Sequence, residues 1–194
     1  MSQIESLPVY NVGVIVGSLS AKSINRQLFQ ALATLAPAAQ LSLVEIPIVD
    51  LKVYNRDYDA EYPAEARSFK SAIEAADSII LVTPEYNRSL PGSLKNAIDW
   101  ASRPWGTNSF NGKPSAVIGT SFGKTGTALA QAHLRNILSH LGSPELGQPE
   151  AFVQNSPGLL GENGEISDDT VAEFLLNWLK AFHTHTARSL TQVL

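Results

Sequence analysis

The stretch SIILVTPEYNRSLPGSLKNAIDW, residues 78–100, decides the fold of this chain. Its first five residues are almost all apolar, which is typical of a strand that is covered on both faces. From Leu94 to Ala101, apolar residues recur at helical spacing. The long polar connection between them contains Pro84 and Pro91, which restrict the shapes that it can take. A strand, a stiff loop and a helix in this order predict one βα unit of a parallel sheet.

The same alternation of strand and helix patterns extends over most of the chain. Short apolar runs predict five strands at residues 10–16, 41–46, 78–82, 115–119 and 151–153. Apolar residues at helical spacing follow each of them. This pattern predicts an α/β fold with a five-stranded parallel sheet and helices on both faces, and the flavodoxin-like strand order 2-1-3-4-5 is favoured. We expect a single domain over residues 1–194, with its core at residues 10–182.

Composition and charge argue against several classes of protein. The chain of 194 residues is 44% hydrophobic and 16% charged, with a net charge of −4. It therefore has no basic field for nucleic acid, no lysine-rich stripe for a membrane and too weak a negative charge for an acidic electron carrier. Without cysteine it has no disulfide, thiolate metal site or cysteine nucleophile. The start, MSQIESLPVYNVG, lacks a signal-peptide pattern and no apolar run approaches about 20 residues, so we expect a cytoplasmic protein.

The first candidate binding loop is GSLSAKSINRQL, residues 17–28. In a sheet of this order, ligands bind beyond the carboxyl ends of the strands, where the loops after the first and third strands face each other. Hydroxyl and amide side chains here surround the start of a helix, whose first N–H groups are unpaired: Ser18, Ser20, Ser23 and Asn25. Ser23 also fits a plain N-cap. The loop lacks the later glycines of G-x-G-x-x-G and suits a terminal monophosphate, to which Lys22 or Arg26 would add positive charge.

The second candidate loop follows the strand at 78–82 and contains Pro84, Glu85, Tyr86 and Asn87. If the first loop binds a phosphate, these residues lie where the flat ring of a mononucleotide would rest. Backbone groups of a stiff loop would then face the edge of the ring. Glu85 and Asn87 either point to the ring or brace the loop, and Tyr86 either stacks on a ring or a partner subunit or is an exposed tyrosine.

The third candidate loop, GTSFGKTGTALA, residues 119–130, resembles a Walker A motif. That motif requires four residues between its glycines, whereas three separate Gly119 from Gly123, and no later strand ends in an aspartate that could hold magnesium. Gly123 and Gly126 instead indicate a close approach of the backbone to a ligand. The four histidines form no metal or catalytic pattern, and no G-x-S-x-G elbow of a hydrolase is present.

The segments GSLSAKSINRQL, TPEYNRSLPGSLKNAIDWASRP and GKPSAVIGTSFGKTGTA, in this order, resemble the NADPH-dependent FMN reductase family, and within it the flavodoxin-like quinone and chromate reductases. The resemblance runs from about Val12 to Phe182, and TPEYN followed by PGSLKNAIDW is its most specific part. It implies that the first loop binds the FMN phosphate, that the second holds the isoalloxazine and that Ser121 lies beside the flavin. The candidate cofactor-binding residues are Ser18, Ser20, Lys22, Ser23, Asn25, Pro84, Glu85, Tyr86, Asn87, Ser121, Phe122 and Gly123. Relatives often have arginine in place of Ser20, and small residues in place of Phe122 and Lys124.

The resemblance also implies an activity. We expect an FMN-dependent NAD(P)H oxidoreductase that reduces quinones or related acceptors by ping-pong hydride transfer through the flavin N5, with no catalytic side chain and no metal. The acceptor (quinone, free flavin, azo compound or metal oxyanion) and the choice between NADPH and NADH stay open. A homodimer or homotetramer is expected, with Tyr86, Arg88 and Trp105 near an interface that walls the flavin pocket. The alternative is a flavodoxin-type electron carrier that NADPH does not reduce directly; a flavin-free receiver or interaction domain would not explain the serine loop.

Overall fold

Five parallel strands form the sheet of this protein, as a computed structural model of residues 7–191 shows. The strands are β1 (Tyr10–Val16), β2 (Leu41–Glu45), β3 (Ser78–Val82), β4 (Ser115–Ser121) and β5 (Phe152–Gln154). Their order is β2-β1-β3-β4-β5, which confirms the predicted flavodoxin-like topology. The structure does not describe residues 1–6 and 192–194. The outer limits of the domain predicted at 1–194 and the first residues of MSQIESLPVYNVG therefore lie outside the described residues.

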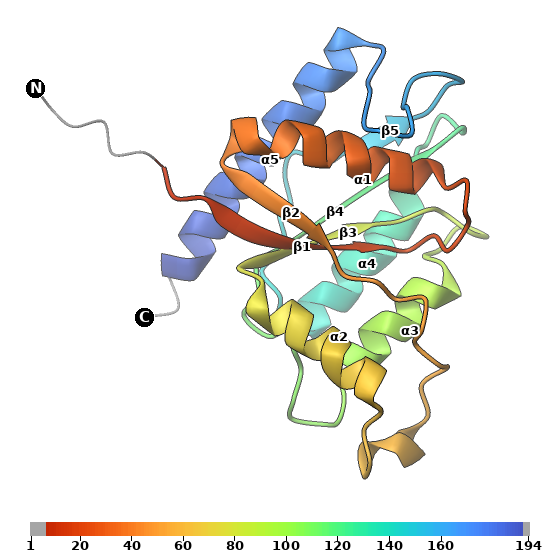
Figure 1. The fold of residues 1–194 in the computed structure, drawn as a ribbon, viewed down its shortest axis with the longest axis vertical. Helices are drawn as coiled ribbons and strands as arrows, with labels where there is room; N and C mark the ends of the chain where they lie inside the picture. The colour runs from red at the N-terminus through yellow and green to blue at the C-terminus, as the bar shows by residue number, and fades with distance from the viewer. Residues whose placement is uncertain (1–6, 192–194) are drawn as a thin grey trace, which may run out of the picture.

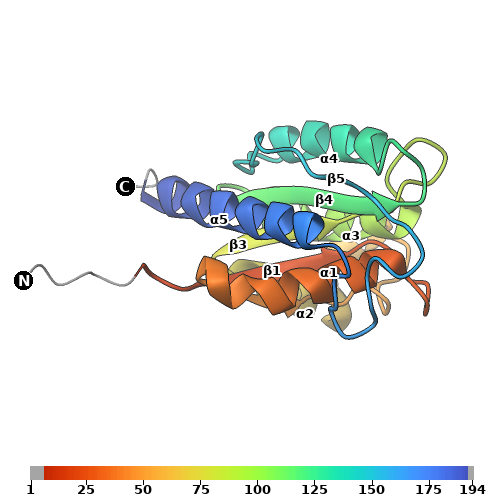
Figure 2. The ribbon, with the colours of Figure 1, turned by 90° about the horizontal axis from the view of Figure 1, so that it is seen from above.

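Helices cover both faces of the sheet, as predicted. They are α1 (Ile24–Leu35), α2 (Ala64–Ala75), α3 (Gly92–Ala101), α4 (Ala128–His140) and α5 (Asp169–Thr191), with short 3-10 helices at Ala36–Ala39 and Arg56–Asp59. Figures 1 and 2 show α1 and α5 together on one side of the sheet, with α2 and α3 on the other. The side chains of α4 pack in the same core as those of α2 and α3.

The strands supply a separate core to each face because successive strand residues point in opposite directions. Val14 and Val16 pack with α1 and α5, whereas Ile15, between them, packs with α2, α3 and α4. Each core contains one large buried tryptophan, Trp178 of α5 in the first and Trp100 of α3 in the second. Continuous apolar runs such as SIILV are therefore explained by burial on both sides.

Three strands have boundaries that differ from the predicted ones. β1 and β3 have the predicted limits, but β2 ends one residue earlier, β4 continues to Ser121 instead of ending at 119, and β5 is shifted by one residue. β4 is longer because Gly119, Thr120 and Ser121 pair with β5 after the pairing with β3 has ended at Ile118. These contacts come from distant segments, which local sequence patterns do not report.

The helix that follows the second loop is anchored firmly. Three tyrosines from the long β2–α2 connection surround Trp100, with ring centroids 5.1, 5.6 and 5.0 Å from it: Tyr54, Tyr58 and Tyr62. The indole Nε1 of Trp100 donates a hydrogen bond to the carbonyl of Lys52 at 2.6 Å. This packing fixes α3, and with it the far end of the loop that begins at Thr83.

None of the helices in residues 7–191 is both long and apolar enough to cross a membrane.

Candidate functional site

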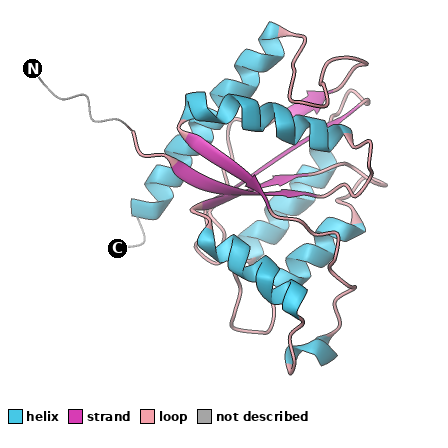
Figure 3. Ribbon diagram, in the orientation of Figure 1, coloured by secondary structure: helices cyan, strands magenta, loops and turns pink. Residues whose placement is uncertain are grey.

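A cavity of about 280 Å³ lies at the carboxyl edge of the sheet, where β1 and β3 meet. The loops after β1, β3 and β4 gather at this edge, at the right of Figure 3. The cavity is lined by ten of the twelve candidate residues and by two further ones, Ile24 and Thr120. Asn87 and Gly123 belong to the same loops but do not line it. The structure therefore brings the three predicted loops together around one space.

The first loop places the start of α1 at one end of this cavity. The Gly17 amide donates to the carbonyl of Val82 at 2.8 Å, so the chain leaves β1 while still paired to β3. Ser23 is the N-cap of α1, one of the two roles that the sequence suggested for it. Its hydroxyl accepts a hydrogen bond from the Arg26 amide at 3.2 Å. As the first residues of the helix, Ile24 and Asn25 carry N–H groups without an intrahelical acceptor. This helix end has the donors that an anion requires.

Hydroxyl groups and one cation complete the first wall. Ser18 is buried and lines the cavity, and its Oγ accepts only a long hydrogen bond, 3.4 Å, from the Ser20 amide. Arg26 is turned to Glu45, with which it forms a salt bridge of 2.6 Å. Lys22 therefore supplies the positive charge on the lining of the cavity. Neutral hydroxyls, free amides and a lysine are a donor set that fits a phosphate monoester.

Asn25 has a role that its sequence position did not reveal. It is buried, its Nδ2 donates to the carbonyl of Thr120 at 3.0 Å, and its Oδ1 accepts from the Thr120 amide at 2.9 Å. The side chain thus pairs with β4 just beyond the point where β3 ends. One amide hydrogen of Asn25 remains for a ligand, but its first function is to fasten α1 to β4.

The second loop folds back on itself in a tight turn. Tyr86 and Ser89 exchange two backbone hydrogen bonds, of 2.9 and 3.0 Å. The two residues between them, Asn87 and Arg88, have φ angles of 51° and 65°. Positive φ at both central positions is the mark of a type I′ turn, in which asparagine is favoured. Asn87 is at the tip of this turn, which explains why it does not line the cavity.

Glu85 braces the loop, one of the two roles left open for it. Its side chain is only 9% exposed. Its Oε2 accepts hydrogen bonds from the amides of Leu129 and Ala130, at 3.0 and 3.3 Å, in the first turn of α4. The second loop is thereby attached to the helix that follows the third loop.

The third loop closes around Ser121. The hydroxyl of Ser121 donates to the carbonyl of Gly126 at 2.5 Å, and Gly126, at φ 56°, lies so close to Phe152 that a Cβ would meet its Cα at 3.1 Å. Gly126, which was predicted to let the backbone approach a ligand closely, instead packs against Phe152 of β5. Phe122 and Tyr86 are 62% and 51% exposed at the cavity, so two aromatic side chains border its mouth.

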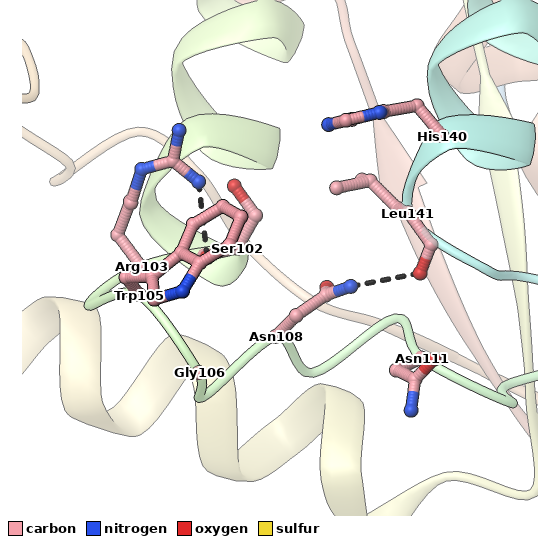
Figure 4. A pocket seen from close by; sticks show the side chains of 8 residues that line it. All are labelled: Ser102, Arg103, Trp105, Gly106, Asn108, Asn111, His140 and Leu141. Atoms are coloured by element: carbon pink, nitrogen blue, oxygen red, sulfur yellow. Dashed lines mark hydrogen bonds between the residues drawn. The ribbon is translucent and has the colours of Figure 1, made fainter.

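Trp105 lies near the amino ends of the strands, at the opposite end of the sheet from the first cavity. α3 runs back from the carboxyl edge, and the loop that follows it leads to the start of β4. In Figure 4, Arg103 and Trp105 of this loop face His140 and Leu141 at the end of α4, across a second cavity of about 330 Å³. None of the twelve candidate residues lines this cavity. Within one chain, Trp105 and Tyr86 do not border the same space.

Three of the four histidines make ordinary structural contacts. His183 and His185 lie within 2.9 Å of the backbone carbonyls of Pro8 and Pro144, and Nδ1 of His133 is 2.9 Å from the hydroxyl of Ser89. Across residues 7–191, no group of three or more histidine, cysteine, aspartate or glutamate side chains could hold a metal ion.

Comparison with known proteins agrees with this geometry. Residues 10–158 match the family model of NADPH-dependent FMN reductase. A 2-hydroxy-1,4-benzoquinone reductase of Burkholderia sp is 45% identical over 88% of this chain and 93% of its own, and a quinone reductase of Pseudomonas putida is 44% identical over 84% and 87%. The solved structure of FerB from Paracoccus denitrificans, a flavoenzyme NAD(P)H:(acceptor) oxidoreductase, has a TM-score of 0.89 and 44% identity over 93% of this chain and 99% of that chain. The chain therefore belongs to the NADPH-dependent FMN reductase family and is a flavodoxin-like oxidoreductase that uses FMN and NAD(P)H.

Proposed function

We propose that FMN occupies the cavity at the carboxyl edge of the sheet and that the protein reduces a quinone or a related small acceptor with NAD(P)H. The observation that carries this proposal is the cavity itself. It has a helix start with free amides at one end, two aromatic side chains at its mouth, and walls from the three loops that the sequence singled out.

The phosphate would be held by the first loop. The amides of Ile24 and Asn25, the hydroxyls of Ser18 and Ser20 and the ammonium of Lys22 are the donors available on that wall. The positive end of the α1 dipole adds to their attraction for an anion. The hydroxyl of Ser23 caps the helix, but it still has its own hydrogen to donate to the phosphate.

The ring would lie between the second and third loops. FMN held there would supply hydride transfer through its N5, and a ping-pong scheme would have NAD(P)H and the acceptor occupy the same face in turn. Pro84 and the turn at 86–89 keep the wall rigid, and Ser121 and Phe122 form the facing wall. The chain's contribution is thus to hold the reactants in position.

No side chain of the cavity is needed as an acid or base in this proposal. Glu85, its one carboxylate, is engaged by two amides of α4. The names of the Burkholderia and Pseudomonas putida relatives support quinones as the class of acceptor.

Anaerobic reduction tests the proposed function. The purified protein, supplied with FMN, should show bound-flavin absorption bands that bleach when NADPH is added, and a quinone should restore them. Bound flavin that neither NADPH nor NADH bleaches would favour the electron carrier. Replacing Pro84, Glu85, Tyr86 and Asn87 with a Gly/Ser turn should abolish FMN binding without unfolding the protein. Full flavin occupancy in that variant would contradict the assigned ring site.

The wider organisation is part of the same proposal: a single cytoplasmic domain that forms a homodimer or homotetramer. Large apolar side chains on the surface support assembly, since Trp105, Val53 and Phe122 are 85%, 83% and 62% exposed. Sedimentation as a monomer at micromolar concentration would contradict it.

A further inference from the structure

Helix α4 begins without a cap from its own N-terminal residue. Thr127 occupies the N-cap position, but its side chain makes no hydrogen bond to the first turn. Its Oγ1 instead accepts from Nε2 of Gln131 at 3.0 Å, and Gln131 Nε2 also donates to the carbonyl of Ala151. Thr127 is thus engaged in holding α4 against the segment before β5, and the first amides of the helix need an acceptor from elsewhere.

Glu85 is that acceptor, 44 and 45 residues away in sequence from the amides of Leu129 and Ala130. Its other oxygen, Oε1, is 3.4 Å from Nη1 of Arg88, on the far side of the turn. A carboxylate with two N–H donors at a helix N-terminus is a favourable arrangement, because the charge and the helix dipole attract each other.

A second contact joins the same two elements. The hydroxyl of Ser89, which closes the turn, is 2.9 Å from Nδ1 of His133, one turn further along α4. The third loop leads directly into α4 at Thr127, and its Ser121 and Phe122 line the cavity opposite Glu85 and Tyr86. The start of α4 therefore connects the two walls between which the ring is proposed to lie.

From these contacts we infer that Glu85 is a positioning residue for the cofactor: it sets the spacing between the loop at 84–89 and the loop at 121–126 and places one negative charge beside the ring. This inference rests on the proposed function. Removing the carboxylate separates the two walls, so the ring loses its fitted site. Replacing it with the neutral amide keeps an acceptor for α4 but removes the charge, which makes the bound flavin easier to reduce.

Three variants test the inference, with Asp168→Ala as the matched control. Asp168 caps α5 in the same way, since its Oδ1 accepts from the amides of Thr170 and Val171 at 2.8 and 3.2 Å, but it does not line the cavity. Glu85→Ala and Asp168→Ala should both lower the melting temperature of the apoprotein by about 2–4 °C, the effect of one lost cap in a chain of this size. Measured by quenching of FMN fluorescence, the Kd for FMN should rise at least about tenfold in Glu85→Ala and stay within about twofold in Asp168→Ala.

The midpoint potential of FMN bound to Glu85→Gln is the measurement that a purely structural role of Glu85 would not change. This variant should bind FMN within about threefold of the wild type, because the amide oxygen still accepts from α4, while the midpoint potential of the bound FMN becomes more positive. An FMN affinity in Glu85→Ala as close to wild type as in Asp168→Ala would overturn the inference, as would an unchanged potential in Glu85→Gln. If Glu85→Ala does not fold, the potential of Glu85→Gln decides. A wild-type protein that binds no FMN would instead refute the proposed function.

Discussion

Replacing Asn25 with alanine should destabilise the protein even when no ligand is bound. The Asn25 amide exchanges two hydrogen bonds, of 3.0 and 2.9 Å, with the carbonyl and the amide of Thr120, and both residues are buried. Alanine would leave two backbone groups of Thr120 without partners beyond the end of β3. Each buried unpaired group costs about 1–3 kcal/mol, so we expect a loss of about 2–4 kcal/mol, a large share of the 5–15 kcal/mol typical of a domain.

Urea denaturation of the apoprotein, followed by tryptophan fluorescence, measures this loss. The unfolding midpoint should fall while the slope of the free energy against urea stays constant. The control is Thr34→Ala on the same helix, an exposed residue whose hydroxyl donates to the carbonyl of Gln30, and it should change stability by less than about 0.5 kcal/mol. An Asn25→Ala variant as stable as this control would refute the claim that Asn25 fastens α1 to β4.

Three other variants test separate features. Burial raises the pKa of Glu145 from 4.5 to about 7 against the pull of Arg135, so its contribution to stability is complete below pH 4.5 and lost as the pH rises through 7. Between pH 5 and pH 8 the free energy of unfolding of the wild type, measured by urea titration, should therefore fall by about 1–2 kcal/mol relative to that of Glu145→Gln, after allowance for solvent screening. The same pH dependence of this free energy in both proteins would contradict the prediction. Arg88→Gly should stabilise the apoprotein by about 0.5–1 kcal/mol, seen as a higher melting temperature, because glycine relieves the φ of 65°; a lower one would argue against the type I′ turn. Ser20→Arg should tighten FMN binding about three- to tenfold in low salt, with the gain shrinking as salt is added, and an unchanged Kd would place the phosphate elsewhere.

The sequence predicted the sheet well because its apolar runs and helical periods are local signals. The order of the strands and the meeting of the loops after β1 and β3 follow from general rules of parallel sheets. The limits of β4 did not follow, because Thr120 and Ser121 are held by β5 and by Asn25, the latter 95 residues away.

The roles of individual site residues were less predictable than their location. Asn25 and Glu85 were expected near a ligand, and both line the cavity, but their hydrogen bonds go to Thr120 and to the start of α4. Each partner is far away in sequence, so no local pattern indicates it. The turn at 86–89 could have been recognised from Asn87, but arginine at the next position hides the usual Asn-Gly signal.

The three tryptophans lie in different parts of the protein, so each can serve as a fluorescent probe of its own surroundings. Trp178 and Trp100 are each 1% exposed, in the cores on opposite faces of the sheet, whereas Trp105 is 85% exposed. A quencher dissolved in water therefore suppresses the fluorescence of Trp105 first, and the remaining emission comes from one tryptophan on each side of the sheet. Single-tryptophan variants can then show whether the two helical layers melt together or one before the other, a question that a single-probe unfolding curve does not resolve.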